Sequence, residues 1–124
     1  MNWVAALRNR MRTLAGHPDP GERKAVEEAI RIETPASGAH WRCVERCVVR
    51  WQVTGALDYP CKVLLEKPTP GGWQPVVTLA TLVDPRACQV AVAVPAMPEG
   101  TYRVRIDSPE LTTAVCSGSL SLTP

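Results

Sequence analysis

The residues with the clearest potential for chemistry are a histidine and three cysteines in the first half of the chain. His40, Cys43 and Cys47 follow one another at spacings of three and four residues, and Cys61 begins the next expected strand. Imidazole and thiolate are ligands that zinc accepts, and a thiolate beside a base can act as a nucleophile. The short knuckle of common zinc sites is absent, however, and Cys43 and Cys47 would have to leave a strand to converge on one ion. We therefore expect no metal site.

No other pattern predicts catalysis or cofactor binding. A cysteine nucleophile needs a nearby base that is itself held by a third group. None of the five cysteines lies in a sequence signature of a family with such an arrangement. The carboxylates of Glu27 and Glu28 are adjacent in an expected helix, so they point apart. Gly71 and Gly72 lie in an expected hairpin and not before a helix, which excludes a phosphate-binding loop. The sequence predicts no catalytic residues and no cofactor.

The cysteine count leaves two interpretations open. The chain contains Cys43, Cys47, Cys61, Cys88 and Cys116. In a small β-sandwich they would suit a disulfide framework in an oxidising compartment. In a reducing compartment they would be small buried apolar residues, and their odd number favours this second interpretation. A count of free thiols separates the two.

Length and charge exclude several classes of protein. A chain of 124 residues holds one domain and a short extra element. The net charge is +2, with no concentrated basic face, so nucleic-acid binding is not expected. The first sixteen residues carry arginines where a secretory signal would be uninterrupted and apolar, and no segment is long enough to span a bilayer. We expect a cytoplasmic protein.

The N-terminal segment has the periodicity of an amphipathic helix. Its apolar residues recur at helical spacing: Trp3, Val4, Leu7, Met11 and Leu14. Three arginines lie largely on the other faces, and Gly16 with Pro18 predicts the end of the helix. The apolar stripe could dock in the groove of a partner protein, pack on the protein's own second helix or sheet, or lie on a membrane surface.

A second short helix is expected after Asp19. This residue precedes Pro20 and has Glu22 three positions later, which is typical of a capped helix start. The helix would extend to about Glu28 or Arg31. Residues 29–35 fit either its last turn or a first strand that ends at Pro35.

The remaining sequence alternates strands with turns. The expected strands cover residues 47–53, 61–65, 73–80, 90–94, 102–106 and 120–122, with 29–35 as an optional seventh. The loop at 67–72 is rich in proline and glycine and predicts a hairpin turn. Six or seven strands at this spacing are typical of an antiparallel β-sandwich.

The segment Met97 to Asp107 indicates which sandwich this is. Its Pro-Glu-Gly turn precedes Tyr102, and Tyr102 opens a strictly alternating strand. The segment resembles the tyrosine corner of immunoglobulin-like and fibronectin type III-like domains, which implies that the Tyr102 hydroxyl bonds back to the loop backbone. We expect a mainly β protein with a helical extension at 1–31 and an immunoglobulin-like sandwich at 32–124.

A further resemblance rests on apolar spacing and turns over about three quarters of the chain. The matching residues are Ile32, Pro35, Gly38, Trp41, Val49, Trp51, Val63, Leu65, Val94, Pro95, Gly100, the run 102–106, Ser117 and Gly118. They are similar to the extracellular sandwich of the Ser/Thr-rich, GPI-anchored fungal cell-wall family. The signal peptide and Ser/Thr-rich tail of that family are missing, and the strand with Tyr102 lacks the cysteine of true immunoglobulin domains. The resemblance implies a fold, and it does not imply export or a cell-wall role.

Candidate recognition residues occur in two places besides the N-terminal helix. Trp73 follows the proline-rich loop at 67–72 and could anchor a partner, or it could fold back over the edge of its own sandwich. Five arginines could form basic stripes: Arg42, Arg46, Arg50, Arg103 and Arg105. In the usual strand order they fall on different sheets, where they would simply solvate the outer faces.

These observations predict a non-enzymatic module for protein–protein interaction or regulation. The expected partner-binding residues are Trp3, Leu7, Met11, Leu14 and Trp73, and the expected structural residues are Trp51 and Tyr102. The partner would be another protein, with a membrane surface as a lesser possibility. The alternatives are a disulfide-containing domain of the cell envelope or extracellular space, and a peripheral membrane protein bound through the N-terminal helix.

Overall fold

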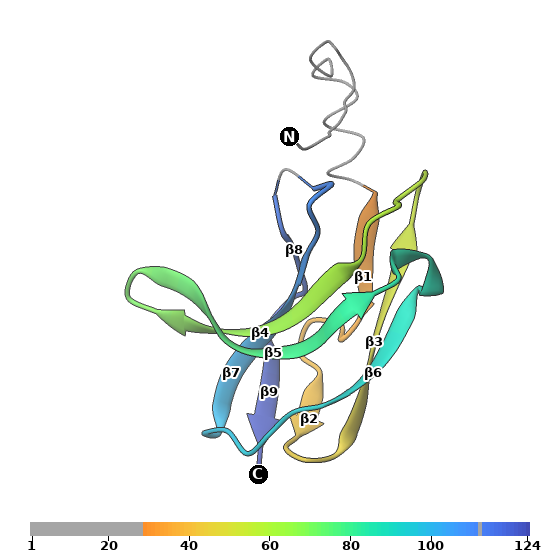
Figure 1. Cartoon of the computed structure of the whole chain (residues 1–124). Helices are drawn as coiled ribbons and strands as arrows, with labels where there is room; N and C mark the ends of the chain where they lie inside the picture. The colour runs from red at the N-terminus through yellow and green to blue at the C-terminus, as the bar shows by residue number, and fades with distance from the viewer. Residues whose placement is uncertain (1–28, 112) are drawn as a thin grey trace.

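The computed structural model describes residues 29–111 and 113–124, and the helices expected within residues 1–28 lie outside this range. Figure 1 shows two β-sheets packed against each other. The strands in chain order are β1 (Ile30–Thr34), β2 (His40–Arg42), β3 (Arg46–Val53), β4 (Cys61–Thr69), β5 (Gly72–Val83), β6 (Gln89–Ala93), β7 (Gly100–Asp107), β8 (Val115–Cys116) and β9 (Leu120–Thr123). A short 3-10 helix, η1 (Pro85–Ala87), joins β5 to β6.

The strands form one small and one large sheet. The small sheet has three strands in the order β1-β3-β6, and the large sheet has six, with the order β2-β9-β7-β4-β5 and β8 also paired with β7. The sandwich prediction is confirmed at this level. Residues 30–34 form a strand and not a last helical turn, so the ambiguity at this segment resolves in favour of β structure.

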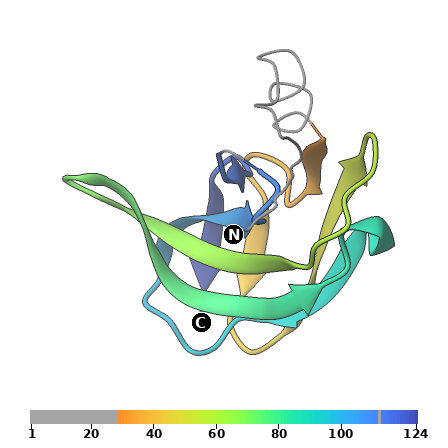
Figure 2. The same cartoon turned by 45° about the horizontal axis from the view of Figure 1, so that its top comes forward.

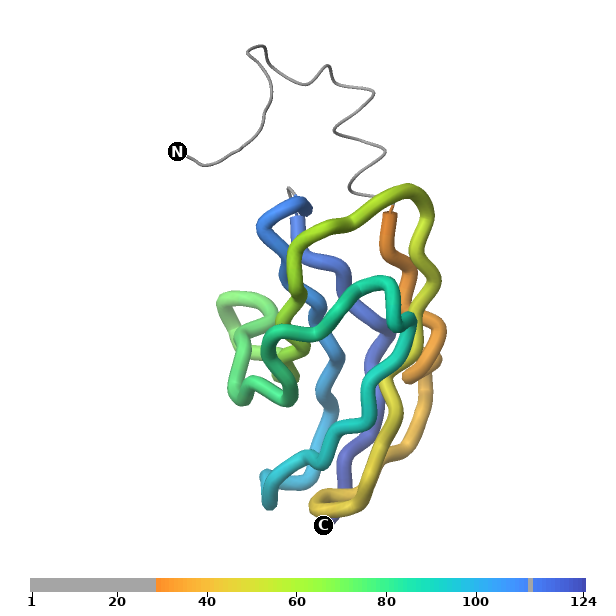
Figure 3. Tube along the Cα trace, turned by 45° about the vertical axis from the view of Figure 1, so that its right-hand side comes forward, coloured from red at the N-terminus to blue at the C-terminus, as the bar shows by residue number. Residues whose placement is uncertain are grey.

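Two details of the strand prediction are wrong. The described residues contain nine strands where six or seven were expected, because β2 and β8 have only three and two residues and are too short to show alternation in sequence. The sheets are also not wholly antiparallel, since β2 pairs in parallel with β9. Between β1 and β2 the chain crosses from the small sheet to the edge of the large one. In this crossing segment the amide of Gly38 donates a 2.8 Å hydrogen bond to the carbonyl of Ser119. Figure 3 shows the turn after β2 beside the C-terminal end of β9, where the amide of Cys43 donates to the carbonyl of Thr123.

The core lies between the two sheets and follows the alternation of the strands. On β3 the side chains of Cys47, Val49 and Trp51 are buried, whereas Arg46 and Arg50 are exposed, as their alternation predicts. The Trp51 indole nitrogen donates a 2.8 Å hydrogen bond to the carbonyl of Pro85, which ties β3 to η1. The other buried apolar side chains come from strands of both sheets and from Val94, directly after β6, and include Val63, Leu65, Val92, Val104, Ile106, Leu120 and Leu122. This shared core makes the two sheets one folding unit.

Tyr102 lies at the start of β7, after the loop that connects the two sheets. It is buried, and its hydroxyl donates a 2.8 Å hydrogen bond to the carbonyl of Pro98, four residues upstream. This is the hydrogen bond that the tyrosine-corner resemblance implies. Together with the two-sheet order, it identifies the fold as an immunoglobulin-like or fibronectin type III-like sandwich.

No helix within the part of the chain that the structure describes is long and apolar enough to cross a membrane.

Gly118 marks the closest approach of the two segments that join β8 to β9 and β1 to β2. A Cβ atom at Gly118 would lie 2.7 Å from Ser37 Cβ and 3.0 Å from the Ser37 Cα. We expect Gly118→Ala to lower the free energy of unfolding by about 1–3 kcal/mol, because the backbone of Ser37 must move. Urea denaturation measures the change. Gly71→Ala is the control, since its nearest contact would be Thr69 Oγ1 at 4.0 Å, and equal losses in the two variants would contradict the prediction.

Candidate functional site

The most highly organised polar group in the described residues is a carboxylate on the large sheet. On β4 the side chains of Val63 and Leu65 point into the core, and Glu66 points to the opposite, outer face of the sheet. Glu66 is nevertheless only 1% exposed. A register shift between Leu65 and Glu66 places one extra residue on the neighbouring strand β5 at this point. A buried charge of this kind must be paired with others.

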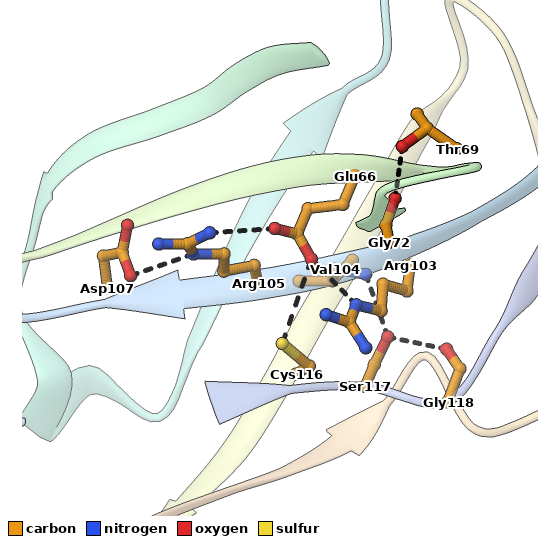
Figure 4. Close-up of polar contacts among 10 residues, drawn as sticks. All are labelled: Glu66, Thr69, Gly72, Arg103, Val104, Arg105, Asp107, Cys116, Ser117 and Gly118. Carbon is orange, nitrogen blue, oxygen red and sulfur yellow. Dashed lines mark hydrogen bonds and ion pairs between the residues drawn. The ribbon is translucent and has the colours of Figure 1, made fainter. Parts of the chain in front are cut away.

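Two arginines from β7 provide the pairing. Arg103 lies directly across from Glu66 in the β4–β7 register, and its Nε donates to Glu66 Oε1 at 2.8 Å. Arg105 donates from Nη1 to Glu66 Oε2 at 2.9 Å and from Nε to Asp107 at 3.0 Å. Figure 4 shows the two guanidinium groups on either side of the Glu66 carboxylate. Each oxygen of the buried carboxylate therefore has its own charged donor.

The charges in this group stabilise one another. Burial alone would raise the pKa of Glu66, but the hydrogen bonds from Arg105 and Arg103 outweigh it and hold the pKa below its ordinary value. The hydrogen bond to Glu66 is the main cause of the raised pKa of Arg105, and Asp107 adds to it. The Glu66 carboxylate is therefore ionised at neutral pH. The geometry of the two guanidinium groups is thereby fixed.

Trp73 completes the group from the adjacent hairpin. Figure 2 shows β4 and β5 as a curved pair whose hairpin end extends beyond the other strands. Thr69 closes the hairpin with a 2.6 Å hydrogen bond to the carbonyl of Gly72, so the expected loop at 67–72 is shorter than predicted and β4 continues to Thr69. The guanidinium of Arg103 lies over the ring of Trp73, 4.5 Å from its centroid. Trp73 is half-buried. Arg103 thus lies over the ring of Trp73 and is hydrogen-bonded to Glu66 at the same time.

The thiol of Cys116 lies beside this group. Cys116 on β8 lies 4.0 Å from Glu66 Oε1. Burial, the largest cause, raises the pKa of Cys116, and Glu66 and Asp107 raise it further against the opposing effect of the arginines. A thiol with a raised pKa is a poor nucleophile and a poor metal ligand at neutral pH.

The histidine and cysteines considered for zinc lie elsewhere in the fold. The His40 ring nitrogen Nε2 is hydrogen-bonded to Thr123 Oγ1 at 3.0 Å. Cys43 and Cys47 are buried and direct their sulfur atoms to the carbonyls of Met97 and Glu45. Across residues 29–111 and 113–124, no three His, Cys, Asp or Glu side chains are placed to hold a metal ion.

The five arginines divide between the two sheets. Arg46 and Arg50 lie on β3 of the small sheet, whereas Arg103 and Arg105 lie on β7 of the large sheet. Arg42, on β2 at the edge of the large sheet, pairs with Glu45 at 3.8 Å on an exposed surface. There is no single basic stripe.

The sequence alone does not predict that these charges meet. Glu66 lies between the expected strand at 61–65 and the expected turn at 67–72, and in the structure β4 continues through it to Thr69. The sequence places Arg103, Arg105 and Asp107 on one face of an alternating strand, but the partner of the arginines on β4 depends on the β4–β7 register. The expected partner-binding residues Trp3, Leu7, Met11 and Leu14 lie outside the described residues, and their role stays a prediction.

Comparison with known proteins finds likeness among solved structures. No protein-family model matches the chain. No curated protein matches it either. The chain is similar to the fibronectin(III)-like modules of CbhA from Clostridium thermocellum, with 14% identity, a TM-score of 0.43, and coverage of 76% of this chain and 94% of that chain. The fold assignment rests on the strand order and the Tyr102 hydrogen bond, and the resemblance to the fungal cell-wall family has no support from these comparisons.

Proposed function

We propose that this protein is a non-enzymatic interaction module that binds another protein through the face formed by Trp73, Arg103, Arg105 and Glu66. We name this surface the tryptophan–arginine face. One observation carries the proposal: the Arg103 guanidinium is stacked on Trp73 and held at the same time by a carboxylate that is 1% exposed.

The arrangement of Arg103 supports a recognition role. Its side chain is 26% exposed, so it is accessible to a partner, and its Nε is already bonded to Glu66. Within the part of the chain that the structure describes, its two terminal nitrogens form no hydrogen bond, so they can donate to a partner. Tryptophan and arginine are the residue types that most often dominate binding energy at protein interfaces. Because the side chain is ordered before binding, less conformational entropy is lost when a partner docks.

The amphipathic helix expected at the N-terminus forms the second part of the proposal. Its apolar residues Trp3, Leu7, Met11 and Leu14 would dock in a groove of the partner. Removal of residues 1–18 tests this part separately from the tryptophan–arginine face. Binding through the N-terminal helix and binding through the tryptophan–arginine face can therefore be contradicted separately.

The proposal is tested by affinity measurement with full-length variants. We expect Trp73→Ala to weaken binding of a partner isolated from the native cell by at least about tenfold, the loss typical of an interface hot spot. Arg103→Lys should weaken it similarly, because lysine keeps the charge but cannot bond Glu66 through Nε and stack as a plane. Lys67→Ala is the matched control on the same hairpin, where the side chain is exposed. Unchanged affinity in both site variants would contradict the proposal.

We also propose that the protein works in a reducing compartment such as the cytoplasm. All five cysteines are free thiols in the structure, and Cys43, Cys47 and Cys61 are buried. Denatured native protein, alkylated without a reductant, should therefore show five reactive thiols by mass spectrometry. A lower count would favour the alternative of a disulfide-containing envelope domain.

A further inference from the structure

The four lateral edges of the two sheets differ in how they are protected. The large sheet ends at β2 and β5, and the small sheet ends at β1 and β6. An edge strand exposes unpaired backbone groups, and proteins usually blunt such edges with charges, prolines, bulges or very short strands. An edge without these devices is a docking site for another strand.

Three of the edges carry such protection. β5 contains Pro75, and its pairing with β4 is interrupted by three register shifts. β1 carries the charged residues Arg31 and Glu33, with a register shift beside Glu33. β2 has only three residues, of which His40 and Arg42 are polar or charged.

The edge at β6 has none of these features. Its sequence, Gln-Val-Ala-Val-Ala, contains no charge and no proline. It pairs with β3 at five consecutive positions, from Arg50 opposite Gln89 to Arg46 opposite Ala93, without a shift. On the outer face of the sheet, Gln89, Ala91 and Ala93 are exposed. Among the described residues β3 is the one strand that pairs with β6, so its other side presents a regular, open backbone ladder.

Two basic side chains border this edge. Arg46 and Arg50 are exposed on the outer face of β3, and neither forms an ion pair within the part of the chain that the structure describes. Arg50 leans over β6, because its Nε donates to Gln89 Oε1 at 3.3 Å. A strand added beside β6 would lie roughly 10 Å from β3, at twice the usual strand spacing. An arginine side chain on β3 and a carboxylate side chain on the added strand can span that distance, since the small side chains of Ala91 and Ala93 lie between them.

We propose that the open edge of β6 accepts an extended segment of another protein as an additional strand, and that this segment carries acidic residues at alternate positions. The backbone ladder would give affinity, and Arg46 and Arg50 would select the acidic side chains. A second copy of this chain fits less well. It would bring the arginines of both copies to one face, and a five-residue edge is small beside the roughly 1,200–2,000 Å² that stable interfaces bury. This site is separate from the tryptophan–arginine face and does not depend on it.

Peptide binding to the full-length chain tests the inference. The probe is a seven-residue peptide of alternating glutamate and valine, with the corresponding lysine–valine peptide as its counterpart. Titration followed by backbone NMR should shift the amides of residues 89–93 for the acidic peptide. The double variant Arg46→Glu, Arg50→Glu should lose at least tenfold in affinity for the acidic peptide and gain affinity for the basic one. Arg31→Glu, on the outer face of β1 in the same sheet, is the control and should change little.

A second measurement tests the backbone ladder itself. Along an extended peptide, alternate amides point to opposite edges, so one alternate set faces β6 and the other faces away. Methylation of the amide nitrogens that face β6 should abolish binding, whereas methylation of the other set should not. Equal binding of the two methylated peptides would overturn the proposal, as would unchanged affinity in the double arginine variant. Shifts confined to residues around Trp73 and Arg103 would also overturn it, and they would point instead to the tryptophan–arginine face. Concentration-dependent dimerisation of the chain alone that is lost in the double arginine variant would assign the edge to a second copy.

Discussion

Trp51→Ala is expected to lower the free energy of unfolding by about 3–5 kcal/mol, the range typical of large buried aromatic side chains replaced by alanine. The Trp51 side chain is 2% exposed and fills the space between β3 and the turn at η1. Its indole also bonds the carbonyl of Pro85. Urea denaturation followed by circular dichroism measures the loss. Because a small domain has little stability to spare, much of this variant should be unfolded at physiological temperature.

Two further variants separate packing from hydrogen bonding at this position. Trp51→Phe keeps most of the apolar volume and removes the indole donor, so it should cost about 1–2 kcal/mol. The carbonyl of Pro85 would still accept from the amide of Cys88 at 3.3 Å. Trp73→Ala is the comparison for an indole that is only half-buried, and it should lose less than about half as much as Trp51→Ala. Equal losses of unfolding free energy in Trp51→Ala and Trp73→Ala would contradict the difference in burial between the two side chains.

Glu66→Gln should cost about 1–3 kcal/mol at neutral pH, the second large effect we expect. Glutamine keeps the shape, but it has no charge and turns an amide donor toward an arginine. Arg103 and Arg105 are 26% and 31% exposed, so water will compensate for part of the loss. The comparison variant is Asp107→Asn. The Asp107 side chain is 33% exposed and, among the described residues, bonds Arg105 alone, so its cost should be smaller.

The effect of Glu66→Gln should depend on pH with a definite sign. The pKa of Glu66 is lower in the folded protein than its ordinary value, so ionised Glu66 stabilises the fold above that ordinary value of about 4.3. This contribution is lost as the pH falls through the folded-state pKa. The difference in unfolding free energy between the native chain and Glu66→Gln should therefore be constant above about pH 5.5 and shrink toward pH 3. A constant difference over the whole range would show that the charge of Glu66 does not matter.

The same variant connects stability with recognition. Loss of the carboxylate charge weakens the hold of residue 66 on the two arginines while Trp73 remains in place. If the tryptophan–arginine face binds a partner because it is ordered in advance, Glu66→Gln should weaken that binding without a direct contact. Binding at the β6 edge lies on the other sheet and should be unaffected.

The sequence by itself determined the class of fold and much of its detail. Alternation along β3 identified the buried face with Cys47, Val49 and Trp51, because successive side chains of a strand point to opposite faces. The turn before Tyr102 predicted the sandwich corner and its hydrogen bond. The proline and glycine run predicted the hairpin between β4 and β5, because these residues set the backbone angles that tight turns require. All of these signals are local, and each lies within about ten residues of chain.

Only the tertiary structure decided where the charged and aromatic residues meet. Glu66 and Arg103 are 37 residues apart, and they pair because β4 and β7 are neighbours in a particular register. The same holds for Trp73 over Arg103, and for the open edge of β6 beside Arg46 and Arg50. Strand order and register depend on how the two sheets bury their common core, and a shift of one residue would reverse every side chain between the two faces. The candidate site is therefore a product of long-range pairing, which local sequence patterns do not encode.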